Sequence, residues 1–285
     1  MSIDIPIIDT HVHIWDPGSI SYPWLADVPK INKPHLPADY RQATVELDIE
    51  TLIFLQCEAD FQQYHQEVQW VTEQIEDEPR FKAMVPWAPL EKGEDAGEEL
   101  AQLARNPLVR GIRRIIQFEP DVKFCLQPRF VRGVQLLAEF DMHFEICIKG
   151  DEQFLNTLKL VDRCPDVQFI LNHIGKPFIK EKIVEPWATY IKELASMPHA
   201  WCKMSGLMNE ADGETWTPDD LRPYIDHVLE SFGLGRVMFG GDWPVCTLAG
   251  THRRWIDMLW DAVNDRSAED RNQLFYANAA KFYRV

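Results

Sequence analysis

The stretch I-I-D-T-H-V-H (residues 7–13) places two histidines where an apolar segment ends. Side chains two residues apart on a strand share a face, so His11 and His13 are predicted to project together from the end of a first strand at 5–9. Imidazole binds zinc-like ions and also polarises carbonyls and carries protons. Taken alone the motif is weak, because two histidines in an ordinary loop explain it equally well.

Seven further apolar runs follow, each separated from the next by a segment with helical periodicity. They cover residues 52–57, 82–87, 109–116, 143–148, 167–173, 200–205 and 236–242. Alternating strands and helices predict a parallel sheet with right-handed crossovers. Eight such units predict a closed (β/α)8 barrel, and the 285 residues fit one such barrel of roughly 250 residues as a single domain over 1–285.

Local signals mark helix ends and loops. Thr217 before Pro218 predicts a helix start, Gly233 the end of that helix, and Ser267 with Asp270 the start of the last helix. The segment 14–45 carries five prolines and is predicted to be a long, largely irregular loop. In a barrel such a loop would cover the C-terminal mouth, where active sites lie.

Composition excludes several classes of partner. The chain is 46% hydrophobic and 26% charged, with a net charge of −16, so neither nucleic acid nor an anionic membrane surface is expected to bind. Six cysteines without a C-x-x-C pair predict a reduced, cytoplasmic protein. Neither a leader peptide nor a membrane-spanning run is recognisable. A homo-oligomer is compatible with the sequence, which leaves the oligomeric state open.

Polar residues recur where the other predicted strands end. His173 and Lys176 lie in N-H-I-G-K-P after the sixth run, and Asp242 lies in F-G-G-D-W-P after the eighth. The remaining runs contribute Glu58, Arg113, Arg114, Glu145, Lys149, Lys203 and Ser205. Each has a structural explanation by itself, such as a core histidine or a helix cap. Together they predict one site, because a barrel collects the ends of its strands at one mouth.

These motifs resemble a known family. D-T-H-V-H, L-N-H-I-G-K-P, C-K-M-S-G-L and M-F-G-G-D-W-P-V occur in the order typical of the sugar-lactonase branch of the amidohydrolase superfamily. That branch includes L-fuconolactonase and L-rhamnonolactonase and, more distantly, 2-pyrone-4,6-dicarboxylate lactonase. The resemblance implies a (β/α)8 fold and hydrolysis of a cyclic ester.

The resemblance also implies roles for individual residues. Asp242 would activate water, while His173, His11 and His13 would polarise the lactone carbonyl. One divalent ion, with zinc as the first choice, would bind to His11, His13 and Asp242; the branch also implies that the reaction can proceed without a metal. The fifth strand offers Glu145 and Cys147 in place of the superfamily's histidine, which argues against a two-metal centre.

The predicted substrate pocket is described more coarsely. Residues predicted to contact the substrate are Trp15, Trp24, Glu58, Trp87, Arg113, Lys149, Lys176 and Trp243. Adjacent strand residues face opposite ways, so one arginine of the pair 113–114 should reach the lumen, and Arg113 is favoured. A neutral sugar lactone is the expected partner, because so few cations are available. A metal-dependent decarboxylase or a dicarboxylate-lactone hydrolase is the alternative, and a non-catalytic binding barrel is a lesser one.

Overall fold

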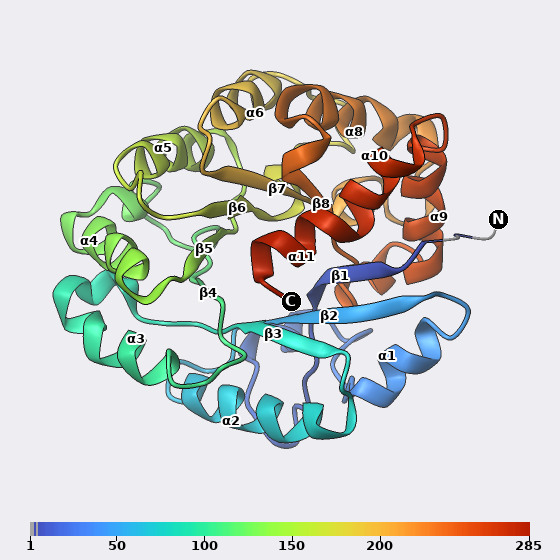
Figure 1. Ribbon diagram of the computed structural model, residues 1–285. Helices are drawn as coiled ribbons and strands as arrows, with labels where there is room; N and C mark the ends of the chain where they lie inside the picture. The colour runs from blue at the N-terminus through green and yellow to red at the C-terminus, as the bar shows by residue number, and fades with distance from the viewer. Residues whose placement is uncertain (1–2, 4) are drawn as a thin grey trace.

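Eight parallel strands form the centre of the molecule in a computed structural model that describes residue 3 and residues 5–285 (Figure 1). The strands are β1 (Ile7–Val12), β2 (Ile49–Leu55), β3 (Phe81–Val85), β4 (Gly111–Arg113), β5 (His143–Ile146), β6 (Phe169–Leu171), β7 (Ala200–Met204) and β8 (Val237–Phe239). Neighbours in sequence pair in order within two sheets, β1–β3 and β4–β8. Parallel bridges from Met84 to Val109 and from Val12 to Trp243 join the two sheets at both seams. The predicted (β/α)8 fold is therefore confirmed.

Helices surround the strands as an outer ring (Figure 1). They are α1 (Pro37–Ala43), α2 (Tyr64–Gln74), α3 (Gly97–Leu103), α4 (Pro128–Leu136), α5 (Asp151–Asp162), α6 (Trp187–Ala195), α7 (Leu207–Glu210), α8 (Pro218–Phe232), α9 (His252–Ala262), α10 (Ala268–Asn272) and α11 (Asn278–Tyr283). Most of the apolar core lies where their inner faces pack on the strands. This is the layering that a hydrophobic stripe on each helix requires.

The predicted helix caps are present. Asp220 accepts hydrogen bonds from the backbone nitrogen and the hydroxyl of Thr217 at the start of α8, and Gly233 ends this helix with φ 66°. At the start of α10, the hydroxyl of Ser267 accepts from the Asp270 amide at 3.1 Å. Side chains here satisfy backbone groups that the first helical turn leaves without partners.

Several predicted strand boundaries were wrong, and two of them lie near the mouth of the barrel. The fourth strand, expected at 109–116, pairs only over Gly111–Arg113, because Arg114 turns away from the barrel towards Glu91 and Glu119. The eighth, expected at 236–242, ends at Phe239 before two glycines. The segment 14–45 is largely irregular, as predicted. It contains α1, which starts at Pro37, where a missing N–H costs nothing.

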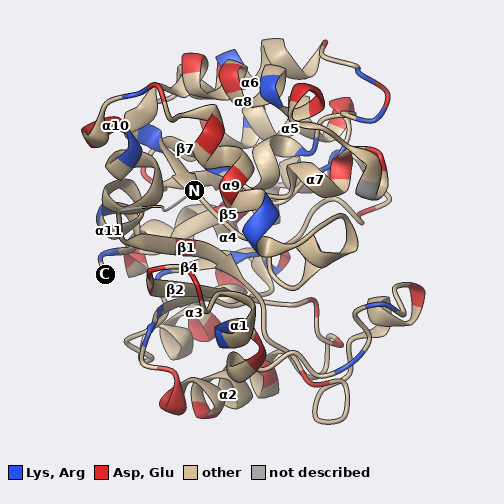
Figure 2. Cartoon of the chain, turned by 90° about the vertical axis from the view of Figure 1, so that its right-hand side faces the viewer, with Lys and Arg blue, Asp and Glu red and all other residues tan. Residues whose placement is uncertain are grey.

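The two ends of the barrel differ. Helix α11 lies across one end (Figure 1), where Ala279 and Tyr283 join an apolar cluster of strand residues. The long loops project from the opposite end, and acidic and basic residues are interspersed over the outer helices (Figure 2). Within the described part of the chain, no helix combines the length and apolarity that a membrane span requires. Because α11 covers one end of the barrel, the end from which the long loops project is the open one.

Candidate active site

A cavity of about 200 Å³, here called the reaction cavity, opens at this end of the barrel. His13, His173 and Asp242 line it, and they come from the ends of β1, β6 and β8. His11 is fully buried beside them, with its ring centroid 4.5 Å from that of His173. The four residues predicted to be catalytic thus lie together, although they are separated by up to 231 positions in the chain.

Two histidine nitrogens converge on one carboxylate oxygen. His11 Nε2 and His13 Nε2 each lie 3.6 Å from Asp242 Oδ1. Nδ1 of His13 lies 2.8 Å from the Leu55 carbonyl oxygen, which can only accept, so Nδ1 carries the proton. Nε2 of His13 therefore presents a lone pair to Asp242.

The same reasoning applies to His11. Its Nε2 lies 3.3 Å from Nη1 of Arg113, which can only donate, so this nitrogen is also an acceptor. The ligand atoms of His11, His13 and Asp242 thus lie within 4.8 Å of one another, and the Arg113 guanidinium donates to the one on His11. Two imidazoles and a carboxylate form a donor set that suits zinc, so His11, His13 and Asp242 can hold a divalent ion.

Burial decides the protonation states. It lowers the pKa of His11 well below its ordinary value and the pKa of His173 to about 3. Burial also lowers the pKa of His13, and the nearby Asp242 carboxylate opposes this only in part. For Asp242, burial raises the pKa, but His173 and His13 outweigh it, and the net pKa lies below the ordinary value. At neutral pH the site combines neutral imidazoles with an ionised carboxylate.

Backbone strain gathers at the cavity. Glu58, His173, Lys176 and Asp242 all line it, and all have left-handed φ values between 52° and 55°. Residues other than glycine adopt this conformation at a cost of order 1–3 kcal/mol. The surrounding fold thus holds four polar side chains in positions that the local backbone does not favour.

Asp9 fixes the backbone beneath these side chains, and its role is absent from the sequence-based prediction. Oδ1 accepts from the amides of His11 at 3.0 Å and Gly241 at 2.7 Å, while Oδ2 accepts from Tyr40 and His252. A Cβ on Gly241 would lie 2.3 Å from Oδ2, so only glycine fits. The signal in the sequence was a carboxylate inside an apolar strand. The pairing of β1 is irregular between Asp9 and Val12, and the Asp9 side chain meets Tyr40 of α1 and His252 of α9 rather than the cavity.

Glu145 and Lys203, expected at the mouth, lie inside the barrel instead. Both are fully buried, and Lys203 Nζ lies 2.9 and 2.7 Å from the two Glu145 oxygens. Tyr283 of α11 donates to Glu145 at 2.7 Å, and Lys203 donates to the Thr10 carbonyl oxygen at 2.7 Å. The pair therefore connects the closed end of the barrel to the strand that carries His11.

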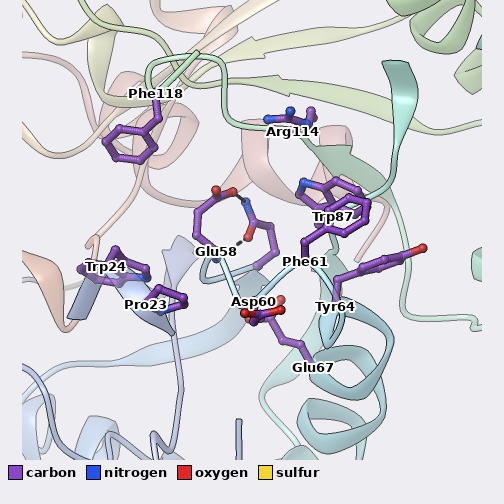
Figure 3. A pocket seen from close by; sticks show the side chains of 12 residues that line it. Pro23, Trp24, Glu58, Asp60, Phe61, Tyr64, Glu67, Trp87, Arg114 and Phe118 are labelled. Carbon is purple, nitrogen blue, oxygen red and sulfur yellow. Dashed lines mark hydrogen bonds between the residues drawn. The ribbon is translucent and has the colours of Figure 1, made fainter. Parts of the chain in front are cut away.

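The structure separates the residues predicted to contact substrate. Those that line the reaction cavity are Trp15, Trp24, Glu58, Arg113 and Lys176. Trp87 lines an adjoining pocket (Figure 3). Trp243 packs on Tyr40 and His35 outside the cavity, and Lys149 pairs with Glu210 at 2.8 Å and does not line it. Of the two arginines, Arg113 points inward to His11, while Arg114 pairs with Glu91 and Glu119.

The chain is similar to proteins of one known family. The family described as Amidohydrolase matches residues 8–285. An L-fucono-1,5-lactonase of Burkholderia multivorans is 31% identical over 288 residues, covering 97% of this chain and 95% of that protein. An L-rhamnono-gamma-lactonase of Scheffersomyces stipitis is 30% identical over 72% of this chain and 69% of its own length.

Solved structures give the same assignment. An amidohydrolase of Burkholderia multivorans with bound zinc superposes with a TM-score of 0.88 at 31% identity, covering 99% of this chain and 100% of that one. The family match covers residues 8–285, and the Burkholderia multivorans lactonase is 31% identical over 97% of this chain. The chain belongs to the amidohydrolase family.

Proposed function

We propose that this amidohydrolase-family protein hydrolyses the cyclic ester of a sugar lactone to the open-chain aldonic acid. The observation that carries the proposal is the meeting of one ionised carboxylate, Asp242, with neutral imidazoles in a cavity at the mouth of the barrel. The names of the relatives, L-fucono-1,5-lactonase and L-rhamnono-gamma-lactonase, support the same chemistry.

Asp242 acts as the general base in this proposal. A water molecule between Asp242 Oδ1 and the His13 Nε2 lone pair donates its protons to these acceptors. Asp242 takes one proton as the water oxygen bonds to the lactone carbonyl carbon. The acyl carbon–ring oxygen bond then breaks, and Asp242 returns its proton to the leaving alkoxide, giving a hydroxy acid.

His173 stabilises the oxyanion of the tetrahedral intermediate. Its Nδ1 lies 3.0 Å from the Ser205 hydroxyl. If that hydroxyl donates, Nε2 carries the proton and can donate to the oxyanion. Lys176, whose Nζ donates to Gln117 at 2.6 Å, adds a second donor at the cavity wall.

A divalent ion fits the same residues. His11, His13 and Asp242 would hold it, and it would supply Lewis-acid polarisation of the carbonyl. Arg113 opposes this arrangement, because its guanidinium occupies the His11 lone pair at 3.3 Å. Without the ion, Asp242 would activate the water, and His173 and Lys176 would stabilise the developing charge.

The charges of the cavity favour a neutral substrate over a dicarboxylate. Arg113 and Lys176 are the cationic side chains among its lining residues, and Arg113 is already directed to His11 and the Gln56 carbonyl oxygen. Glu58 lines the same cavity and would repel carboxylates, while Glu210 at the cavity wall is paired with Lys149. This distribution supports a sugar lactone rather than a pyrone dicarboxylate.

Proton release tests the proposal directly. Purified protein is mixed with fucono-, rhamnono-, galactono-, arabinono- and xylonolactones, and the acid formed is followed with a pH indicator, with and without chelator. We expect rapid hydrolysis of at least one sugar series, and a rate about 10²–10⁴-fold lower in Asp242→Asn. Absence of hydrolysis across the panel, with zinc added, would reject the sugar-lactonase function.

A further inference from the structure

A second pocket adjoins the reaction cavity and is larger. This outer pocket has a volume of about 350 Å³, against about 200 Å³ for the reaction cavity. Trp24, Glu58 and Phe118 line both. Pockets for drug-sized ligands occupy about 300–1,000 Å³, so the reaction cavity alone is small and the two together form one elongated site.

Aromatic rings form the walls of the outer pocket. Figure 3 shows Trp24 and Phe118 on one side of Glu58, with Phe61, Tyr64 and Trp87 on the other. The ring centroid of Trp87 lies 4.4 Å from that of Tyr64 and 5.2 Å from that of Phe61. Phe61 and Phe118 are 61% and 68% exposed.

Two exposed phenylalanines at one pocket are a costly arrangement in water unless a ligand covers them. Flat rings suit the C–H faces of a sugar, since aromatic side chains offer a large apolar surface. The rings are set on both sides of the passage from the reaction cavity, so a group attached to a bound lactone would pass between them.

The polar groups of the outer pocket are mainly acidic. Glu58 accepts from the amide of buried Gln56 at 2.7 Å, which fixes its carboxylate between the two cavities. Asp60 and Glu67 also line the pocket. Arg114 is the cation among the lining residues, and Glu91 and Glu119 already neutralise it. Carboxylates accept hydrogen bonds from hydroxyl groups and repel anions.

We propose that the outer pocket is a second sugar subsite, so that the substrate class is an aldonolactone carrying a further neutral sugar ring. The lactone ring lies in the reaction cavity, and the second ring lies between Phe61 and Phe118 with its hydroxyls on Glu58 and Asp60. Only the placement of the lactone ring rests on the proposed function; the binding of the second ring rests on the outer pocket itself.

Matched substrates test the subsite. The kcat/KM of cellobiono-1,5-lactone is compared with that of D-glucono-1,5-lactone, which lacks the second ring. We expect the disaccharide lactone to be the better substrate. In Phe61→Ala the ratio of the two kcat/KM values should fall by about threefold to tenfold, the size of effect that one aromatic contact gives.

Val45→Ala is the control variant, because Val45 is 73% exposed and does not line either pocket. It should leave the ratio unchanged. A disaccharide lactone whose second ring is a uronic acid should lose the advantage, because the outer pocket is acidic. A ratio at or below one in the wild type, or a ratio that Phe61→Ala leaves unchanged, would overturn the subsite.

Binding separates this inference from the proposed function. If neither lactone is hydrolysed, cellobionate and gluconate are titrated against the tryptophan fluorescence of the wild type, since Trp24 and Trp87 line the outer pocket. Tighter binding of cellobionate that weakens in Phe61→Ala would keep the subsite while the lactonase function fails. Equal binding of both acids would reject the subsite.

Discussion

Asp9 Oδ1 lies 2.7 Å from the backbone nitrogen of Gly241 and thereby ties the first strand to the residue that precedes Asp242. The same oxygen accepts from the His11 amide at 3.0 Å. The buried Asp9 carboxylate therefore sets the spacing between His11 and Asp242, which meet at the candidate metal and water site. Backbone hydrogen bonds hold the same seam, since the Asp242 amide donates to the His11 carbonyl oxygen and the His13 amide donates to the Trp243 carbonyl oxygen, both at 2.8 Å.

Replacing Asp9 should cost both stability and activity. Asp9→Ala leaves buried donors on Gly241, Tyr40 and His252 without their acceptor, at about 1–3 kcal/mol for each unsatisfied group. We expect urea denaturation to show a loss of at least about 3 kcal/mol. Asp9→Asn keeps one acceptor oxygen and should lose less. An Asp9→Ala protein as stable as the wild type would show that the carboxylate does not hold the seam.

Asp242→Asn should remove general-base catalysis while preserving the fold. Asp242 has φ 55°, and asparagine tolerates this left-handed conformation better than most residues. A positioned base contributes about 10²–10⁴-fold, so kcat for the best lactone should fall by that factor. Unchanged circular dichroism and melting temperature would exclude unfolding as the cause. Near-normal turnover in this variant would remove Asp242 from the mechanism.

The sequence predicts the frame of the barrel and the composition of its mouth better than the details of the site. Apolar runs at regular intervals are sufficient for eight strands, and the ends of parallel strands meet whatever their exact length. His11, His13, His173 and Asp242 therefore come together despite errors in strands four and eight.

Side-chain direction could not be predicted in the same way. Glu145 and Lys203 lie within β5 and β7 rather than after them, so their side chains are buried inside the barrel instead of lining the mouth. Trp243 directly follows Asp242, beyond the end of β8, yet it packs on Tyr40 outside the reaction cavity. Tyr283 reaches Glu145 across 138 positions, and the sequence contains no local signal for that contact.

Zinc binding should depend on His13 and should increase when Arg113 is removed. Arg113→Met frees the Nε2 lone pair of His11 and removes a positive charge 3.3 Å from it. Because a hydrogen bond to a charged group contributes about 1.5–3 kcal/mol, we expect zinc affinity to rise by about tenfold or more. Competition with a chromophoric chelator measures this affinity.

The control for that experiment is Arg114→Met, since Arg114 pairs with Glu91 and Glu119 away from the reaction cavity. It should leave the zinc affinity at the wild-type value. His13→Ala should abolish stoichiometric binding. Zinc that binds as tightly to His13→Ala as to the wild type would place the ion elsewhere, and an unchanged affinity in Arg113→Met would show that the guanidinium does not compete.

The buried pair of Glu145 and Lys203 should make stability depend on pH in the acid range. Burial raises the pKa of Glu145, but the charge of Lys203 outweighs it and holds the folded-state pKa below the ordinary value of 4.5. As pH falls below about 4.5 the unfolded chain takes up this proton first, so the folded state loses stability there. Glu145→Gln should flatten this part of the curve of unfolding free energy against pH.

Lys203→Met supplies the second arm of this test. It leaves a fully buried carboxylate without its cationic partner, which costs about 3–5 kcal/mol. The double variant Glu145→Gln with Lys203→Met removes both charges and should recover most of that loss, since a neutral pair carries no uncompensated charge. Thermal and urea denaturation of the four proteins between pH 3 and 7 measure the coupling. If the two single losses simply add in the double variant, Glu145 and Lys203 do not stabilise the barrel as a pair.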